Sequence, residues 1–414
     1  MRVLVGAYAC EPGSGSEPGV GWNWPVQAAL HGHTVHVITR ANNRDVIETE
    51  LAARPIAGLT FHFYDLPHAF LWAKRHGGYY GLLAYYYFWQ LGIKRLARRL
   101  HQEIGPFDLA HHVTFVNDWM PSGVAGLRLP FIWGPIGGST HVIPKAFKGA
   151  LAPRERSFEA IRRGTQELLK RFDPFVIATR RSARLILTYT EEALAGIPRR
   201  FRSKTRPIVH IGVIEAELPA KRSVSKRDDG FNVLTGGRLV HWKGFDLLIE
   251  GFGRIAPANP SIRIDVTGKG SFKATLERLA ASSGIEERVR FLGQLPDRSD
   301  VYAALVECDL FALPTLRDGP PVAILEAMLA GKPILCLDFG ATRELVPDQA
   351  GIKIPVHSRP QVVADLAAAL EWAVEHPEDL GKMGQEGRKH ALSVHNWARI
   401  GDEIDAIYRE VAGA

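Results

Sequence analysis

Two series of short apolar segments, each alternating with helical patterns, constrain the fold of this chain more than any other feature. The first series opens with a strand at Val3–Val5, a glycine-rich loop, a helix that ends near Leu30, and a strand at Thr34–Thr39. Strands and helices that alternate in this way are typical of parallel, doubly wound sheets. Further strands of this series are predicted at Leu59–Phe63, Leu109–Val113, Phe131–Trp133 and Leu185–Thr188.

A polar, charged stretch from Glu215 to Gly230 separates the two series, and its composition indicates an interdomain linker. Helical patterns at Phe245–Ile255 and Phe272–Ser282 then alternate with strands. A last amphipathic helix, from about Trp397 to Val411, has an apolar face that needs a packing partner. Strands of the second series are predicted at Phe231–Thr235, Ile262–Val266, Val289–Leu292, Leu310–Leu313 and Pro333–Leu337.

We therefore predict an α/β protein with two doubly wound, Rossmann-like lobes that face a central cleft. A chain of 414 residues is long enough for two such domains. The predicted boundaries are 1–214 for an N-terminal domain, 215–230 for the linker and 231–392 for a C-terminal domain. Residues 393–414 are predicted to form a helix that packs back toward the first domain.

The three cysteines, Cys10, Cys308 and Cys336, are widely spaced, which argues against a disulfide framework and a zinc site. Their number indicates a reducing compartment, so we expect a cytoplasmic protein. Apolar runs are too short for a membrane-spanning helix. The aromatic stretch Tyr79–Ile93, followed by basic residues, is consistent with a core helix or with a surface that docks on the inner face of a membrane.

Positive charge is concentrated between Lys145 and Arg206, a segment that contains sixteen Lys and Arg residues but only six Asp and Glu residues. Such a segment is consistent with a solvated basic face, or with attraction to anionic lipid or to a pyrophosphate-bearing acceptor. No nucleic-acid-binding motif accompanies the charge, so we do not expect a nucleic-acid partner.

Two loops of the second series carry residues suited to a nucleotide-sugar. The segment Gly237–Gly244 places Arg238 and Lys243 between a strand and a helix, where cations and helix N–H groups suit a diphosphate. The later segment places Asp318 and Glu326 around a helix start, where carboxylates can accept hydrogen bonds from sugar hydroxyls.

The order and spacing of several motifs resemble the retaining glycosyltransferases of family 4, which have the two-lobe GT-B architecture. The resemblance spans nearly the whole chain. In the first half it rests on the loop Gly13–Gly19, Gly32–Val35 and Gly134–Gly138. In the second half it rests on Gly237–Leu239 with Lys243–Gly244, Gly268–Gly270, Phe291–Gly293, Asp318 with Glu326–Met328, and Gly331–Pro333.

The resemblance implies a retaining transferase that moves a hexose-type sugar from a nucleoside diphosphate to a hydroxyl acceptor, in glycan, polysaccharide or glycolipid biosynthesis. Arg238 and Lys243 would stabilise the leaving phosphate, Asp318 would contact the donor sugar, and Glu326 would bind the ribose. The acceptor, either free or lipid-linked, would bind the N-terminal domain. The implied donor-binding set is Gly15, Ser16, Gly237, Arg238, Lys243, Gly268, Gly293, Leu295, Asp318, Gly319, Val322 and Glu326.

No Asp-x-Asp sequence occurs, so we expect cations and helix dipoles, rather than a metal or a cofactor, to neutralise the diphosphate. The histidine that many relatives have after the strand at Phe131–Trp133 is replaced by Pro135–Gly138. We therefore consider Gly137 and Gly138, and also His111 and His112, as candidates on the acceptor or sugar side. A histidine at a strand end is also often a structural core residue.

Two departures concern the donor loop. Asp318 stands where the family has glutamate, and as an N-cap before Gly319-Pro320-Pro321 it could equally serve only the helix. Pro320 and Pro321 lack the backbone N–H that other residues would offer a ligand. A catalytically silent subunit is therefore one alternative.

The other alternative is a nicotinamide-dependent oxidoreductase, because Gly13-x-Gly15-x-x-x-Gly19 follows a strand as dinucleotide-binding loops do. Against it, the second strand ends at Thr39-Arg40 without the acidic residue that would bind a ribose.

Overall fold

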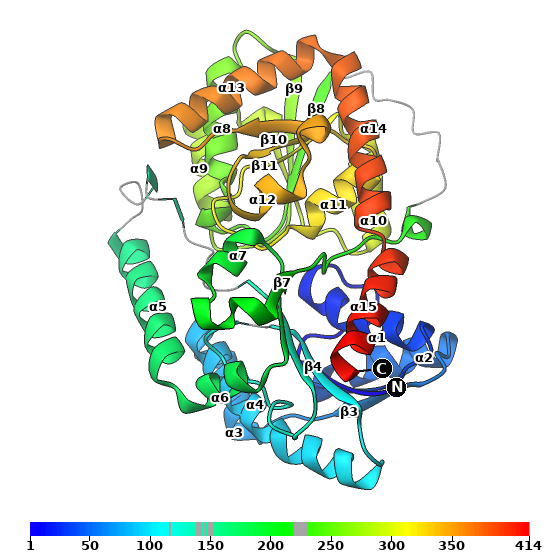
Figure 1. The fold of residues 1–414 in the computed structure, drawn as a ribbon. Coiled ribbons are helices and arrows are strands. Elements are labelled where there is room, and N and C mark those ends of the chain that lie inside the picture. The colour runs from blue at the N-terminus through cyan, green and yellow to red at the C-terminus, as the bar shows by residue number, and fades with distance from the viewer. Residues whose placement is uncertain (116, 138–142, 145, 148–152, 219–229, 414) are drawn as a thin grey trace. The chain divides into compact units, whose positions relative to one another are not determined.

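The computed structural model describes residues 1–115, 117–137, 143–144, 146–147, 153–218 and 230–413. The chain divides into two compact units, and each is built on a parallel sheet covered by helices (Figure 1). This confirms the predicted α/β class with two Rossmann-like lobes. The first unit comprises Met1–Thr140, Ser157–His210 and Trp397–Ala414, and the second comprises His141–Arg156 and Ile211–Asn396.

The sheet of the first unit has the strand order β3-β2-β1-β4-β5-β6-β7, and all of its pairings are parallel. Its central strands are buried along nearly their whole length, which suits the apolar sequences of β1 and β5, whereas β4 buries two histidines among its apolar residues. The strands are β1 (Arg2–Ala7), β2 (Thr34–Thr39), β3 (Leu59–Phe63), β4 (Leu109–Thr114), β5 (Phe131–Ile136), β6 (Leu185–Thr188) and β7 (Thr205–Pro207).

Helix α4 supplies much of the core of this unit. Its side chains Tyr85, Tyr86, Trp89 and Ile93 are buried and recur at helical spacing, so one face of the helix packs on the sheet. The helices of the first unit are α1 (Ser16–Leu30), α2 (Arg44–Ala53), α3 (His68–His76), α4 (Gly78–Glu103), α6 (Pro174–Ser182), α7 (Glu191–Gly196) and α15 (Trp397–Ala412), together with most of α5 (Pro153–Phe172).

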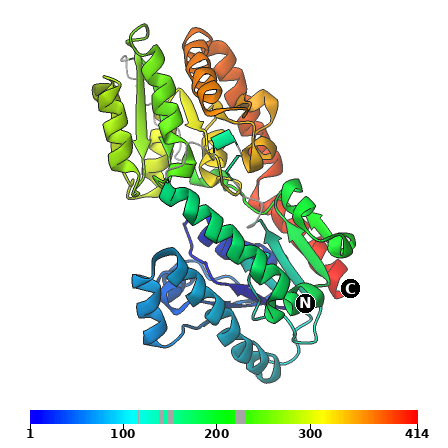
Figure 2. The ribbon, with the colours of Figure 1, turned by 90° about the vertical axis from the view of Figure 1, so that its left-hand side faces the viewer.

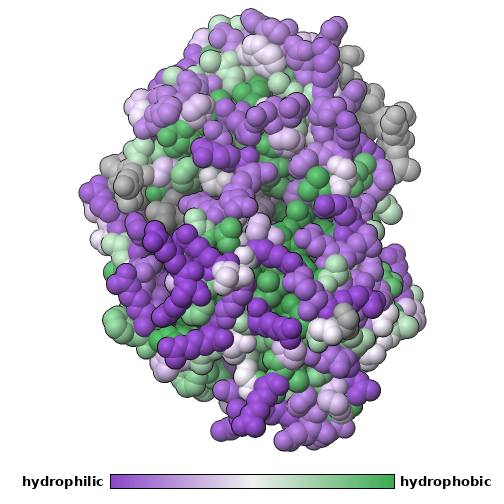
Figure 3. Space-filling model, in the orientation of Figure 1, coloured by the Kyte–Doolittle hydropathy of each residue, from purple (hydrophilic) through white to green (hydrophobic). Residues whose placement is uncertain are grey.

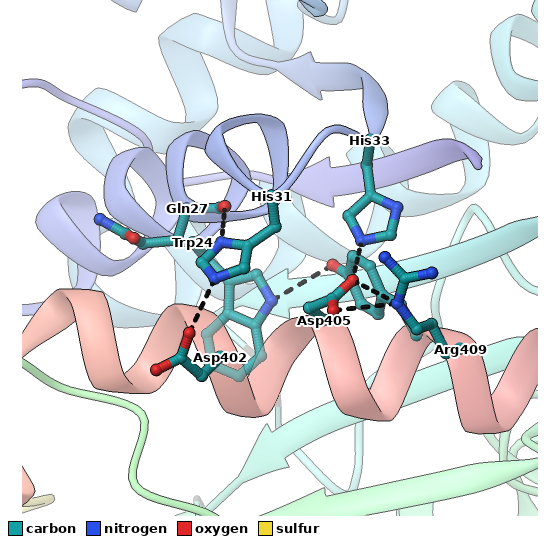
Figure 4. A network of polar contacts seen from close by, with 8 residues as sticks. Trp24, Gln27, His31, His33, Asp402, Asp405 and Arg409 are labelled. Carbon is teal, nitrogen blue, oxygen red and sulfur yellow. Dashed lines mark hydrogen bonds and ion pairs between the residues drawn. The ribbon is translucent and has the colours of Figure 1, made fainter.

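The C-terminal helix α15 packs against α1, at the opposite end of the sequence (Figure 4). The indole Nε1 of Trp24 donates to the buried Tyr408 hydroxyl at 3.2 Å. His33 Nε2 lies 2.8 Å from Asp405 Oδ1. A side chain at Gly401 would collide with Gln27, so this glycine allows the two helices to approach closely. The last helix thus belongs to the first unit.

The second unit, which is mainly the green-to-orange part of the ribbon in Figure 2, has a sheet with the order β10-β9-β8-β11-β12-β13, again with parallel pairings. Because β8 lies between β9 and β11, the order reverses there, as in doubly wound folds. The strands are β8 (Phe231–Gly236), β9 (Ile262–Thr267), β10 (Val289–Gly293), β11 (Leu310–Leu313), β12 (Ile334–Leu337) and β13 (Gly351–Ile354).

Helix α8 shows why the second series folds as predicted. Its residues Phe245, Leu248, Phe252 and Ile255 are spaced at helical intervals and are all buried. The helices of this unit are α8 (Phe245–Ile255), α9 (Lys273–Ser282), α10 (Arg298–Glu307), α11 (Val322–Leu329), α12 (Gly340–Leu345), α13 (Arg359–Glu375) and α14 (Pro377–Val394).

Every predicted strand is present, with ends shifted by three residues at most. Two edge strands that were not predicted, β7 and β13, are only three and four residues long. The start of the predicted linker forms a short 3-10 helix at Glu215–Glu217, and its residues 219–229 lie outside the described part.

Hydrophilic residues predominate on the face shown in Figure 3, with small hydrophobic patches between them, as on most folded proteins. Among the described residues, no helix combines the length and the apolarity that crossing a membrane would require.

Candidate functional site

The carboxyl ends of the second sheet bring the predicted donor residues to one edge. Gly237, Arg238 and Lys243 follow β8, and Gly268 follows β9. Gly293 ends β10, and Leu295 comes two residues later. Since these strands are parallel, the loops after them share the edge where doubly wound sheets bind ligands. The loop after β11 adds Asp318 and Gly319, and helix α11, which follows this loop, adds Val322 and Glu326.

Lys243 and Asp318 form an ion pair between the loops after β8 and β11. The Lys243 ammonium also lies beside Gly237, because an added Cβ there would stand 3.8 Å from Nζ. The two loops are joined again through Trp242, whose carbonyl oxygen accepts a hydrogen bond from the Leu316 N–H at 2.8 Å. The cation and the carboxylate are therefore held together by the fold.

Trp242 also organises the arginines of this edge. The guanidinium of Arg317 lies 4.1 Å from the ring centroid of Trp242, and that of Arg238 lies 5.8 Å from it. Arg238 is exposed, and no carboxylate of the described residues lies within ion-pair distance of it. Arg238 is thus a cation whose charge is available to an anionic ligand.

Close backbone approaches shape the same loops. Gly244 precedes α8 with a φ of 72°, and a side chain there would collide with the Pro314 carbonyl oxygen. Gly268 has a φ of 115°, and a Cβ on it would lie 1.9 Å from the Gly237 oxygen. Only glycine fits these two positions, so the backbones around the predicted phosphate site can pack closely.

Glu326 is held by an arginine that the sequence analysis did not select. Its Oε1 lies 3.1 Å from Nη2 of Arg298, and the same Nη2 lies 2.9 Å from Oε2 of Glu217. Arg298 therefore bridges two carboxylates, one on α11 and one in the 3-10 helix at the start of the predicted linker. Burial raises the pKa of Glu326 to about 6, although the Arg298 charge opposes the rise.

Asp318 is not the N-cap of α11, which corrects one of the two roles considered for it. The residue at the N-cap is Pro321, with extended backbone and no side-chain hydrogen bond to the helix. Val322 is the first helical residue, so its N–H is among the groups that have no partner within the helix. Asp318 lies three residues before this N-cap, and its carboxylate forms an ion pair with Lys243.

The predicted donor residues of the first unit lie in the loop after β1. Ser16, which stands where the family has a second glycine, has a φ of 57° and so adopts the left-handed conformation that glycine favours. Gly15 is its N-terminal neighbour and the N-cap of α1. Glu17, in the first turn, accepts a hydrogen bond from the Phe115 N–H at 2.5 Å, which places a carboxylate at this helix start.

His111 and His112 are core residues, and this corrects their placement on the acceptor or sugar side. His111 is fully buried, and its ring nitrogens lie 2.9 Å from the Tyr408 hydroxyl and 2.9 Å from the Gly134 carbonyl oxygen. His112 Nε2 lies 3.0 Å from the Tyr86 hydroxyl. Burial lowers the pKa of His111 to about 3 and that of His112 to about 4, so both stay neutral at pH 7.

Gly137 also has a packing role, since an added Cβ would overlap the Tyr189 ring. Gly138 lies outside the described residues.

The sequence analysis did not select Arg298, Glu217 or Trp242. Arg298 follows Asp297, which forms a capping box with Asp300, so the helix start was visible in the sequence but the target of the arginine was not. Glu217 falls in a segment that reads as a linker. In the described part of the chain, no three His, Cys, Asp or Glu side chains are grouped so that they could hold a metal ion.

Comparisons with known proteins agree with this architecture. Residues 219–390 match the family model described as Glycosyl transferases group 1. A curated relative from Corynebacterium glutamicum, a GDP-mannose-dependent monoacylated alpha-(1-6)-phosphatidylinositol monomannoside mannosyltransferase, is 27% identical over 201 residues. That alignment covers 46% of this chain and 51% of the relative, so the chain spans about half the length of the protein it matches.

Two solved structures share the fold over the whole chain. Sucrose-phosphate synthase from Thermosynechococcus elongatus has a TM-score of 0.69 at 17% identity, and the match covers 100% of this chain and 99% of that one. Anabaena HepE in complex with UDP-glucose has a TM-score of 0.65 at 18% identity, with 99% and 100% covered. The chain therefore matches the glycosyl transferases group 1 over residues 219–390, and its two Rossmann-like lobes have the GT-B fold.

Proposed function

We propose that this protein is a retaining, metal-independent glycosyltransferase of family 4 that moves a hexose-type sugar from a nucleoside-diphosphate sugar to a hydroxyl acceptor. The reaction would serve glycan, polysaccharide or glycolipid biosynthesis. The observation that carries the proposal is the arrangement of Arg238, Lys243 and Asp318 on adjacent loops at one sheet edge, with Glu326 on the helix that follows the second loop. The relatives support it, because one is a GDP-mannose-dependent mannosyltransferase and another binds UDP-glucose.

In this proposal the donor diphosphate lies against the loop after β8. Breaking the sugar–phosphate bond leaves negative charge on the departing phosphate, and Arg238 and Lys243 would stabilise that charge. Glu326, already oriented by Arg298, would accept hydrogen bonds from the ribose hydroxyls. Asp318, beside Lys243, would accept from a hydroxyl of the donor sugar.

Retention and metal independence are parts of the proposal that rest on the resemblance and on residue chemistry. A departing phosphate oxygen would take the proton of the acceptor hydroxyl on the face where the new bond forms. The cations would then do what a divalent metal does at other diphosphate sites. Added EDTA is expected to leave turnover unchanged, and a loss that Mg²⁺ restores would refute metal independence.

A thermal-shift screen tests the donor assignment. A ligand that binds the folded state raises the apparent stability by RT ln(1 + [L]/Kd). We expect one nucleoside diphosphate and the corresponding nucleoside-diphosphate sugar to raise the melting temperature. The double variant Arg238→Ala, Lys243→Ala should abolish this shift. A shift with NAD but with no nucleoside diphosphate would instead favour the oxidoreductase. Donor binding without any transfer or donor hydrolysis over hours would favour a silent subunit.

We further propose that the first unit docks on the inner face of an anionic membrane. Exposed aromatic side chains on α3 and α4 include Trp72, which is 65% exposed, and Phe88, which is 45% exposed. The ring of Tyr79 lies 5.6 Å from that of Phe158, so α5 lies beside this surface. Helix α5 adds exposed Ile161, Leu168 and Phe172 within the basic segment. Aromatic and apolar groups interleaved with cations suit an anionic interface.

Vesicle co-sedimentation tests the docking. We expect binding to vesicles that contain phosphatidylglycerol and little binding to pure phosphatidylcholine. Trp72→Ser combined with Phe172→Ser should lower the bound fraction, whereas Leu30→Ser, which removes a 65% exposed side chain of α1, is the matched control. Equal binding of all variants would refute the docking surface without affecting the donor assignment.

A further inference from the structure

A second group of cations lies at the carboxyl edge of the first sheet. Tyr8 follows β1, Arg40 follows β2, and Asp65 comes two residues after β3. Lys74, on α3, reaches the same place, because its Nζ lies 5.5 Å from the Tyr8 ring centroid and 5.0 Å from that of Tyr85. The Arg40 guanidinium faces the same two rings at 5.4 and 5.3 Å. Both cations therefore converge on one pair of aromatic rings.

The single carboxylate of this group is already engaged. Asp65 accepts a hydrogen bond from Arg40 Nε at 2.9 Å and another from the Tyr85 hydroxyl at 2.7 Å. Within the described residues, no carboxylate lies at ion-pair distance from Lys74, and no oxygen accepts a hydrogen bond from it. The group thus contains two cations, Arg40 and Lys74, and one carboxylate, Asp65, which pairs with Arg40. The charge of Lys74 therefore leaves a net positive charge at this edge.

The Tyr8 hydroxyl adds a second unmet requirement. Tyr8 is only 5% exposed, and its hydroxyl makes no hydrogen bond of normal geometry within the described residues, although the nearby Arg40 charge opposes the burial that raises its pKa. A buried hydroxyl without a partner costs free energy. Burial, together with the charge of Arg40, also lowers the pKa of Lys74 to about 8, so the ammonium is poorly compensated where it stands. An anion that accepts hydrogen bonds would satisfy both groups.

We propose that Arg40, Lys74 and the Tyr8 hydroxyl form a subsite for a phosphate group carried by the glycosyl acceptor. The carboxyl edge of the sheet is where doubly wound folds bind ligands. The hydrogen-bond donors of Arg40, Lys74 and Tyr8, together with the net positive charge, suit a phosphate oxyanion. The proposal rests on the proposed function in one respect, namely that the first unit binds the acceptor. The phosphate can belong to a soluble sugar phosphate or to a lipid headgroup, and the two sources differ in ester type.

Calorimetric titration of the full-length protein tests the subsite. Saturating nucleoside diphosphate, chosen by the thermal-shift screen, first occupies the Arg238 and Lys243 loop so that the probe cannot bind there. Glycerol 3-phosphate then probes a soluble monoester, and dihexanoyl phosphatidylglycerol below its micelle concentration probes a lipid diester. Glycerol serves as the neutral reference. We expect binding of at least one phosphate probe and none of glycerol.

The variants separate the subsite from general charge and from folding. Lys74→Gln should weaken phosphate binding about tenfold or more, as loss of a charge-assisted hydrogen bond does. Lys94→Gln, which removes a half-buried lysine of α4, should not. Tyr8→Phe should also weaken phosphate binding but should not lower the melting temperature without phosphate, because the buried hydroxyl makes no hydrogen bond within the described residues that the variant would lose.

Absence of phosphate binding, or equal binding by wild type, Lys74→Gln and Tyr8→Phe, overturns the subsite. If the nucleoside diphosphate still binds in that case, the proposed function stands and only the subsite fails. If no nucleoside diphosphate binds, the proposed function fails, and the titrations repeated without it on an Arg238→Ala, Lys243→Ala background judge the subsite alone.

Discussion

Lys243 donates a hydrogen bond to the Asp318 carboxylate, although 75 residues separate them in the chain. The Lys243 side chain is 12% exposed and that of Asp318 is 26% exposed, so water screens the pair only in part. A diphosphate that approaches Lys243 must share the ammonium with Asp318 or displace the carboxylate. The pair therefore determines how much positive charge the loop offers a donor.

Removing either cation should impair catalysis. Arg238→Ala and Lys243→Ala are each expected to lower kcat on the order of 10²- to 10³-fold, as loss of a preorganised charge-stabilising group does. Lys382→Ala is the control, because this lysine is exposed on α14 and pairs with the surface residue Asp379. Steady-state kinetics with the best donor measure the effect. Full turnover in both variants would remove Arg238 and Lys243 from the mechanism.

Neutralising Asp318 should separate binding of the diphosphate from use of the sugar. Asp318→Asn frees Lys243, so the affinity for the nucleoside diphosphate is expected to rise about two- to fivefold, the range of a partly exposed ion pair. Turnover should fall, because the contact with the donor sugar is lost. Calorimetry and kinetics measure the two effects, with Asp379→Asn as the control. Unchanged affinity in Asp318→Asn would show that the ion pair does not reduce the binding of the diphosphate to the Lys243 ammonium.

Donor affinity should depend on pH through Glu326. Its folded pKa of about 6 lies above the usual value for glutamate, so the fold favours the protonated form. The stability contribution of this proton is present at low pH and is lost as the pH rises through about 6. Binding of the ribose needs the ionised carboxylate, so affinity should fall as the pH drops below about 6.

The probe for this titration should be a sugar nucleotide, because its diphosphate has no terminal phosphate group titrating near pH 6, whereas a nucleoside diphosphate has one. Glu326→Gln is expected to remove the inflection. An inflection that persists in Glu326→Gln would assign it to another group.

Arg298 should hold the pKa of Glu326 down. In Arg298→Met, Glu326 and Glu217 lose their shared cation, so the inflection of the donor affinity should move to a higher pH. Arg298→Lys keeps the charge and should retain most of the wild-type profile. If the profile of Arg298→Met matches wild type, Arg298 does not act through Glu326.

The last helix should contribute stability through one hydroxyl. Tyr408→Phe leaves Trp24 Nε1 and His111 Nδ1 without their buried partner, at a cost of about 1–3 kcal/mol. Urea denaturation followed by circular dichroism measures the change. Tyr80→Phe is the control, because Tyr80 is 42% exposed and its substitution should change the stability by less than about 0.5 kcal/mol. Equal stability of the two variants would show that the buried hydroxyl contributes nothing.

Local patterns predicted most of the secondary structure. The strand at Thr34–Thr39 and the helix at Phe245–Ile255 have the bounds that the sequence indicates, since each packs one continuous apolar run or face. β7 and β13 were missed because three or four residues carry too little periodicity to stand out. The aromatic stretch of α4 was consistent with a core helix or a membrane surface. The structure places Trp89 in the core and leaves Phe88 exposed, and contact with a membrane stays a prediction.

Local residue patterns were enough to predict the α/β class, the two sheets, the loops with Arg238, Lys243 and Asp318, and the helix with Glu326, because apolar periodicity and turn residues act over short stretches of chain. The packed fold was needed to show that Asp318 pairs with Lys243, that Arg298 bridges Glu217 and Glu326, and that His111 lies in the core beside Tyr408. Asp318 and Lys243 are 75 positions apart in the chain, and His111 and Tyr408 are 297 positions apart. Residues this far apart show no regular spacing that would mark them as partners. Long-range partners are selected by how the helices and strands pack together, and no local pattern of residues encodes that choice.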